Sequence, residues 1–195
     1  MTASVRYGVF FAQAVAAHST CVADDFSYFH ANVIGTSLKL RVSAESQATA
    51  DRAKLVALQE IERLGSIFSH YDSGTEFAKF RDLPIGSTAS LSPELFECLC
   101  RFDDWSKLSN GAFNAGAEEL IGLSQDAENT NLVPDSKRLT ASVKKATSAH
   151  GSLNSEQQTA TRRSDAAVSL KALAKRIILD AVCDEVLSNL KNVTG

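Results

Sequence analysis

The segment from Thr36 to Val42 alternates polar and apolar side chains, and it is the feature that most limits what this chain can fold into. Such an alternation predicts a strand with one buried face, which carries Leu38, Leu40 and Val42. A strand on its own leaves backbone N–H and C=O groups unpaired along both edges. The chain must therefore form a sheet whose other strands come from elsewhere in the sequence or from residues beyond Gly195.

Long helices are predicted for much of the remaining sequence. Apolar residues recur at three- and four-residue steps over residues 47–68 and 170–190. A third helix begins at Ser92-Pro93-Glu94, where a hydroxyl cap, a first-turn proline and a carboxylate combine, and it ends at Asn110-Gly111. A shorter helix is expected over residues 134–149. Together with the strand, these helices predict an α+β fold with a mixed sheet and packed helices.

Two segments are expected to be loops. Residues 124–131 are polar, and residues 150–165 have few large apolar side chains, which leaves room for one edge strand. In the helix that begins at Ser92, five residues are predicted to face inward: Leu95, Leu99, Phe102, Trp105 and Leu108.

Composition excludes several kinds of function. The formal net charge of -3 argues against nucleic acid as a partner, and one Trp and three Tyr provide no platform for stacked bases. The four cysteines, Cys21, Cys98, Cys100 and Cys183, have neither zinc spacing nor a C-x-x-C pair, and they are interpreted as small buried apolar residues.

The N-terminus contains a candidate signal or leader segment, residues 1–25. Arg6 precedes an apolar run from Tyr7 to Ala17 with small residues of the kind that a signal peptidase recognises, and this run is short for a membrane span. Two interpretations remain open. The protein is exported to the periplasm or cell envelope, where it could associate with the membrane, or the segment has no such role and the protein is cytoplasmic. Residues 26–195 then form the body of the fold.

Four segments in a fixed order carry a resemblance. They are Val33-Ile34-Gly35-Thr36-Ser37, Phe68-Ser69-His70-Tyr71-Asp72, the helix from Ser92 with Ser109-Asn110-Gly111-Ala112-Phe113-Asn114 after it, and Ser169-Leu170-Lys171-Ala172-Leu173-Ala174-Lys175. Each motif alone is weak, whereas four at compatible spacing from about residue 29 onward are specific. Together they resemble the N-terminal part of the FAD:protein FMN transferases, the ApbE family once described as thiamine-biosynthesis lipoproteins.

The resemblance implies a magnesium-dependent enzyme that moves the FMN part of FAD onto a Ser or Thr hydroxyl of a target flavoprotein and releases AMP. FAD would be the substrate, Mg²⁺ would neutralise its pyrophosphate, and the acceptor hydroxyl would attack phosphorus. The matching positions assign no catalytic side chain.

The first three motifs supply five of the ligand contacts that the resemblance implies. Ile34 matches a residue that packs on the flavin, and Tyr71 matches an aromatic side chain that lies against the ligand. A turn before a strand and an ordinary core aromatic are the alternatives for these two. Ala112, Phe113 and Asn114 match a Gly-Ala-Phe-Asp segment that holds FAD. Asn114 replaces the Asp, so it keeps hydrogen-bonding capacity but loses the charge.

The fourth motif adds Ser169, where the family tends to have Asp or Asn, and Lys175, which matches a ligand-contacting position. Ala172 matches a small residue whose backbone carbonyl reaches the metal. Arg176 replaces a Gly that allows close approach of the backbone. Lys175 and Arg176 also fit the solvated face of an amphipathic helix, and we expect Arg176 to point to solvent.

The family continues beyond the last helix into a Gly-Gly-Asp segment and a later motif that binds magnesium. The chain is therefore expected to be truncated at its C-terminus and, alone, to show no FMN transfer. A carbonyl at Ala172 cannot by itself hold a cation that takes about six oxygen ligands. The alternative to a transferase is an inactive fragment that retains at most flavin or protein binding.

Overall fold

A computed structural model describes residues 10–15, 24–33, 35–147 and 151–191. The chain divides into two compact units. The first comprises residues 1–65 with 175–195, and the second comprises residues 66–174. Among the described residues, none of the helices is long and apolar enough to cross a lipid bilayer.

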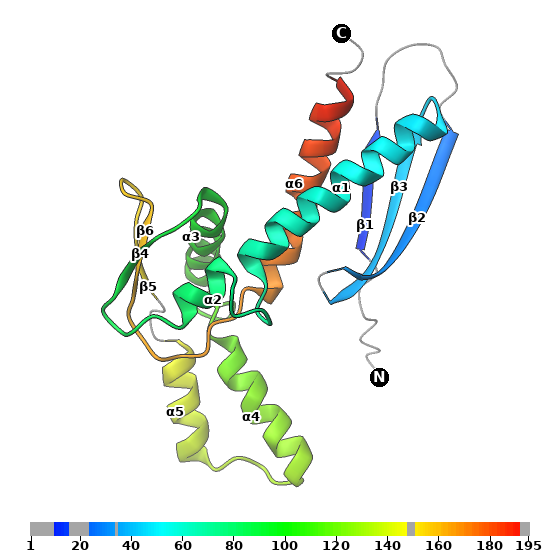
Figure 1. Cartoon of the computed structure of the whole chain (residues 1–195). Helices are drawn as coiled ribbons and strands as arrows, with labels where there is room; N and C mark the ends of the chain where they lie inside the picture. Colours follow the sequence, from blue (N-terminus) through cyan, green and yellow to red (C-terminus); the bar gives the residue numbers. More distant parts are fainter. Residues whose placement is uncertain (1–9, 16–23, 34, 148–150, 192–195) are drawn as a thin grey trace. The chain divides into compact units, whose positions relative to one another are not determined.

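The first unit contains a three-stranded sheet in the order β1-β3-β2 (Figure 1). Its strands are β1 (Phe10–Val15), β2 (Asp24–Val33) and β3 (Thr36–Ala44). The predicted strand is β3, which pairs with β1 in parallel and with β2 antiparallel, so both of its edges are covered. Its partners therefore come from earlier in the chain. Leu38, Leu40 and Val42 are buried, as the alternation predicted.

Strand β1 consists of the same apolar residues from which a leader was predicted. Phe10 lies opposite Leu38, and Val15 lies opposite Ser43. Cleavage after Ala17 would remove this strand and leave one edge of β3 unpaired. The rest of the predicted leader, residues 1–9 and 16–23, lies outside the described part of the chain.

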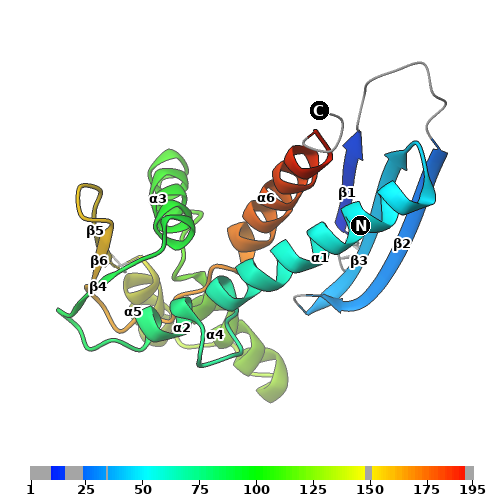
Figure 2. The ribbon, with the colours of Figure 1, turned by 45° about the horizontal axis from the view of Figure 1, so that its top comes forward.

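Helix α1 (Gln47–Phe68) has the predicted bounds and lies across the sheet in both views (Figures 1 and 2). Its Ala50, Ala53 and Ala57 are buried, and these small side chains allow close packing. The Tyr28 hydroxyl of β2 donates a hydrogen bond of 2.9 Å to Asp51 of α1. Helix α6 (Lys171–Lys191) confirms the last predicted helix. In the first unit it buries Ile178, Val182 and Val186.

The second unit combines a small antiparallel sheet, in the order β4-β6-β5, with four helices. Its elements are α2 (Glu76–Arg81), β4 (Thr88–Ser90), α3 (Pro93–Leu108), α4 (Ala117–Thr130), α5 (Ser136–Ala146), β5 (Gly151–Asn154) and β6 (Thr159–Arg162). Helices α4 and α5 form a helical hairpin in this unit (Figure 1).

The expected loop over residues 124–131 is wrong, because α4 continues to Thr130 and ends at Asn131 in the left-handed conformation with φ 52°. Helix α4 buries Leu123 and exposes the polar residues that follow it, so its second half carries little apolar periodicity. Residues 150–165 contain the β5–β6 hairpin rather than a loop with one edge strand.

Helix α3 begins as predicted. Ser92 Oγ accepts a hydrogen bond of 3.3 Å from the Leu95 N–H, and Glu76 accepts one of 2.6 Å from the Ser92 N–H. Leu95, Leu99 and Phe102 are buried. The inward assignment of Trp105 and Leu108 is wrong, because their side chains are 53% and 76% exposed. Burial on α3 ends at Phe102, and its last turn lies at the surface.

The cysteine interpretation holds for Cys98, which is buried on α3, and burial raises the pKa of its thiol to about 12. Cys100 and Cys183 are half-buried, and Cys21 lies outside the described residues.

Candidate ligand-binding site

The start of α6 brings the third and fourth motifs together in the second unit. The backbone N–H of Ser169 donates a hydrogen bond of 2.8 Å to the carbonyl of Ala115, in the turn that leads into α4. Ser169 Oγ in turn accepts from the N–H of Lys171 at 3.4 Å. These bonds place the first turn of α6 against the segment that follows Asn114.

The Asn114 side chain organises its own loop. Its amide nitrogen donates to the Gly111 carbonyl at 2.8 Å, and its amide oxygen accepts from the Gly116 N–H at 2.8 Å. Gly111 has φ 82°, which glycine adopts without strain. An aspartate would lack the donor that reaches Gly111, so asparagine suits this loop.

An aromatic cluster flanks this loop. The Phe113 ring stacks on Phe102 at 5.3 Å between centroids, and Trp105 meets it edge-on at 6.4 Å. Ala112 is exposed beside them. Trp105, which was expected in the core, instead lies at the surface next to an implied ligand contact.

Lys171 is the residue that connects the remaining segments. Its ammonium lies 3.1 Å from the Glu118 carboxylate of α4 and 5.6 Å from the centroid of the Tyr71 ring. Burial draws the pKa of Glu118 upward, but hydrogen bonds from Lys171 and Ser169 and the charges of Lys171 and His70 together leave that pKa below its ordinary value. The second and fourth motifs therefore meet around this one cation, together with Glu118 of α4, which follows the third motif. We call this group the Lys171 cluster: Tyr71, Glu118, Ser169 and Lys171.

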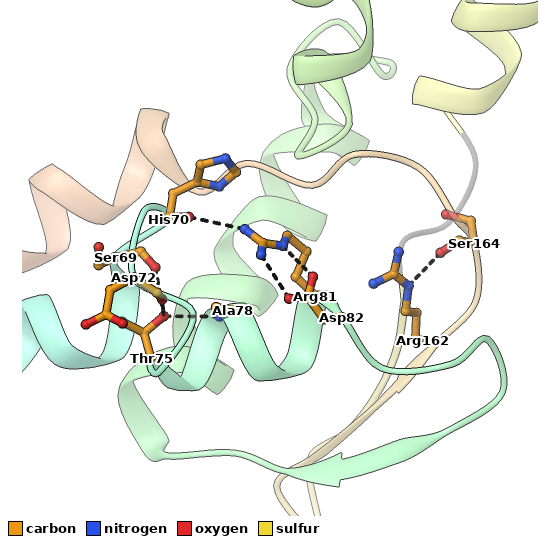
Figure 3. A network of polar contacts seen from close by, with 9 residues as sticks. All are labelled: Ser69, His70, Asp72, Thr75, Ala78, Arg81, Asp82, Arg162 and Ser164. Carbon is orange, nitrogen blue, oxygen red and sulfur yellow. Dashed lines mark hydrogen bonds and ion pairs between the residues drawn. The ribbon is translucent and has the colours of Figure 1, made fainter.

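Tyr71 belongs to the turn between α1 and α2, whose Ser69, His70, Asp72 and Thr75 are shown with their hydrogen-bond partners in Figure 3. Thr75 Oγ1 lies 2.8 Å from the Ser69 carbonyl and accepts from the Ala78 N–H at 3.2 Å, which caps α2. Arg81 donates to the His70 carbonyl at 3.2 Å. This frame leaves Tyr71 83% exposed, so the core alternative for this aromatic is wrong.

His70 lies beside Tyr71, with the two rings edge-to-face at 5.7 Å. Its Nδ1 is buried and has no hydrogen-bond partner among the described residues. Burial lowers the pKa of His70, the charges of Lys171 and Arg81 lower it further, and the charge of Glu118 opposes them. The imidazole is therefore held neutral near pH 7.

In the first unit, Lys175 lines a shallow pocket of about 20 Å³ together with the start of β3. Thr36, Ser37 and Leu38 form one wall, and Ile61 and Ile178 contribute apolar side chains. Gly35 precedes strand β3 and has φ 67°, as expected of a turn before a strand. Ile34 lies outside the described residues. A pocket this small holds a water-sized group rather than a flavin ring.

Arg176 points to solvent, as expected. Its guanidinium is 73% exposed and pairs with Asp180 one turn along α6 at 2.8 Å. That ion pair raises the pKa of Arg176. The substitution of Gly by Arg therefore places no charge inside the described pocket.

The described residues do not fit a magnesium ion. Ala172 is the one residue to which the resemblance assigns a metal ligand, and its carbonyl is a single oxygen. Within residues 10–15, 24–33, 35–147 and 151–191, no three His, Cys, Asp or Glu side chains form a group that could hold a metal. The Glu118 carboxylate of α4 already binds the Lys171 ammonium of α6.

Sequence reasoning missed three members of this site: His70, Glu118 and Lys171. His70 and Lys171 stood inside the quoted motifs, so the sequence did point to their segments. The sequence could not show their roles, because the Lys171–Glu118 pair joins residues 53 positions apart and depends on how α4 meets α6.

Solved structures share this fold. The apo form of Pseudomonas stutzeri flavinyl transferase ApbE aligns with 18% identity and a TM-score of 0.68, covering 88% of this chain and 57% of that chain. The ApbE protein of Thermotoga maritima aligns with 20% identity and a TM-score of 0.70, covering 85% of this chain and 53% of that chain. The flavin transferase ApbE of Vibrio cholerae aligns with 17% identity and a TM-score of 0.67, covering 85% of this chain and 54% of that chain. This chain thus spans just over half the length of these proteins.

These likenesses confirm the predicted α+β fold. Nothing among the curated proteins matches the chain. The sequence matches the ApbE family over residues 34–194, which is most of its length. On that match, and on the four ordered motifs within it, the chain belongs to the ApbE family.

Proposed function

We propose that this chain forms the FAD-binding part of a flavin transferase, which moves FMN from FAD onto a Ser or Thr hydroxyl of a target flavoprotein. The observation that supports this is that the second and fourth motifs meet at the Lys171 cluster, next to the segment that follows the third motif. In the proposed reaction the acceptor hydroxyl attacks the FMN phosphorus, the bond between the two phosphates breaks, AMP leaves, and the hydroxyl proton is lost.

Several side chains would bind FAD. In the second unit, Tyr71 presents an exposed ring for stacking, Phe113 lies in the aromatic cluster beside Ala112, and Ser169 offers a hydroxyl group. Asn114 would act indirectly by holding the loop that carries Phe113. Magnesium is implied by the family resemblance, but the described residues do not form its site, so no step of this proposal uses it.

FAD titration tests the binding half of this proposal. Trp105 is the single tryptophan and lies 6.4 Å from Phe113, so its fluorescence should fall as FAD binds. Replacing Tyr71 with Ala should weaken binding roughly tenfold, since stacking on an aromatic ring contributes about 1–3 kcal/mol. Phe29→Ala is the matched control, because Phe29 is also an exposed aromatic (70%) but belongs to β2. No change in Trp105 fluorescence at any FAD concentration would contradict the proposal.

A second candidate function is flavin binding without transfer. It is favoured by Asn114, which replaces a family Asp, carries no charge and uses both ends of its amide within its own loop. Incubation with FAD, Mg²⁺ and a Thr-containing acceptor peptide separates the two candidates. A fluorescent flavin–peptide adduct on a denaturing gel supports transfer, whereas FAD binding without an adduct supports the binding module.

We also propose export to the periplasm or cell envelope, on the basis of the apolar run that ends at Ala17. N-terminal sequencing of the protein from fractionated cells tests this. An intact N-terminus in the cytoplasmic fraction would contradict export.

A further inference from the structure

We infer that Lys171 supplies the positive charge beside the phosphates of FAD in this chain, so that FAD binds without a divalent cation. The inference rests on the proposed function and deepens it. It starts from the residues at the start of α6: the family resemblance implies a single metal-binding carbonyl there, at Ala172, and among the described residues no three His, Cys, Asp or Glu side chains form a group that could hold a metal.

A cation of the chain itself lies at the start of α6. The Lys171 ammonium lies 3.1 Å from the Glu118 carboxylate, and the Glu118 and Lys171 side chains are 26% and 44% exposed. A divalent ion bound to the same carboxylate would lie close to the ammonium, and the two positive charges would repel each other. Lysine and a divalent ion are therefore alternatives at the Glu118 carboxylate.

The ammonium can also contact a ligand. It is a point charge with three N–H donors, and its hydrogen bond to Glu118 uses one of them. Lysine binds phosphate in this manner in many proteins. The partial exposure of Lys171 leaves its head group accessible to an anion.

The surroundings of Lys171 select the class of anion. The Tyr71 ring lies 5.6 Å from the ammonium and is 83% exposed, so an aromatic group and a phosphate could be bound side by side. A nucleotide diphosphate with an aromatic ring, such as FAD or ADP, has both parts. Inorganic phosphate lacks the ring and should bind more weakly.

The test is a calorimetric titration of FAD, ADP and inorganic phosphate into the whole chain, in EDTA and again in Mg²⁺. We expect FAD affinities that agree within about twofold between the two conditions. Lys171→Met should weaken FAD binding at least about tenfold in EDTA, and Lys171→Arg, which keeps the charge, should restore most of it. Lys144→Met is the matched control, because Lys144 is an exposed lysine on α5 in the same unit.

The outcomes separate the two claims. FAD binding that requires Mg²⁺, or that is equal in Lys171→Met and the parent, overturns the inference and leaves the proposed function standing. An absence of FAD binding in both conditions overturns the proposed function and the inference with it. Circular dichroism and the urea midpoint of each variant check that helix content and stability match the parent, so that lost binding reports on the charge.

Discussion

The backbone N–H of Ser169 donates a hydrogen bond of 2.8 Å to the carbonyl of Ala115, although the two residues are far apart in sequence. This bond fixes the start of α6 against the turn before α4, directly after the third motif. Because the donor belongs to the backbone, most substitutions at position 169 keep it.

The first prediction removes that donor. Ser169→Pro has no N–H, so the Ala115 carbonyl loses its partner, and we expect a loss of roughly 1–3 kcal/mol in the free energy of unfolding. Ser169→Asn keeps both the N–H and a side-chain acceptor and serves as the control. Urea denaturation measures both variants, and equal midpoints would show that the bond contributes little.

The second prediction concerns the two aromatic residues of α3 that contact Phe113. Phe102 is 3% exposed, so Phe102→Ala should cost about 3–5 kcal/mol. Trp105 is 53% exposed, and Trp105→Ala should cost less than about 1 kcal/mol. Because Trp105 is the only tryptophan, unfolding of its variant is followed by circular dichroism. A larger loss in Trp105→Ala than in Phe102→Ala would contradict the observed burial.

The third prediction tests the solvent-facing position of Arg176. Arg176→Gly removes the exposed ion pair with Asp180 and places glycine inside a helix, so the urea midpoint should fall slightly. FAD affinity should not change at low or moderate salt. Arg176→Gln, which keeps helix propensity, separates the effect of the charge from that of the backbone. A tenfold weakening of FAD binding that fades as salt rises would show that Arg176 contacts phosphate.

The fourth prediction uses the lowered pKa of His70. Its main cause is burial, and the charges of Lys171 and Arg81 add to it. The unfolded chain takes up a proton near the ordinary value of about 6.5, whereas the folded chain does so only at lower pH. Proton uptake therefore favours the unfolded state as pH falls from about 6.5 toward the folded-state pKa, and no further loss from His70 occurs below it.

The variant His70→Gln has no titrating ring, so its stability should fall less steeply between pH 7.5 and 5. Urea midpoints measured across this range for the parent and the variant check the slope. Parallel curves would mean that His70 titrates alike in the folded and unfolded chain. The fall in stability of Lys171→Met with pH should be intermediate between those of the parent and His70→Gln, because this change removes one of the charges that lower the pKa of His70.

Some elements could be predicted from the sequence because their signals are local. The polar–apolar alternation of β3, the long stripe of α1, and the Ser92 cap with Pro93 after it all depend on residues within a few positions of one another. The family resemblance likewise rests on short motifs in order. The solvent-facing position of Arg176 followed from the stripe of its own helix.

Other features depended on the tertiary structure. The second half of α4 is polar, so its helix is recognised only when Leu123 packs and the hairpin with α5 forms. Trp105 continues the apolar spacing of α3, yet burial ends before the last turn of that helix, and spacing cannot show where a neighbouring element stops.

The sequence by itself determined helices α1, α3, α5 and α6, the central strand, the family and the identity of the motif residues, because these follow from local patterns. The tertiary structure decided that Lys171 pairs with Glu118 and lies over Tyr71. Those contacts join the turn that carries Tyr71 to helices α4 and α6, and Tyr71 and Lys171 are 100 positions apart in the chain. An ion pair depends on distances of a few ångströms, and only the packing of α6 against its neighbours in the second unit sets such distances.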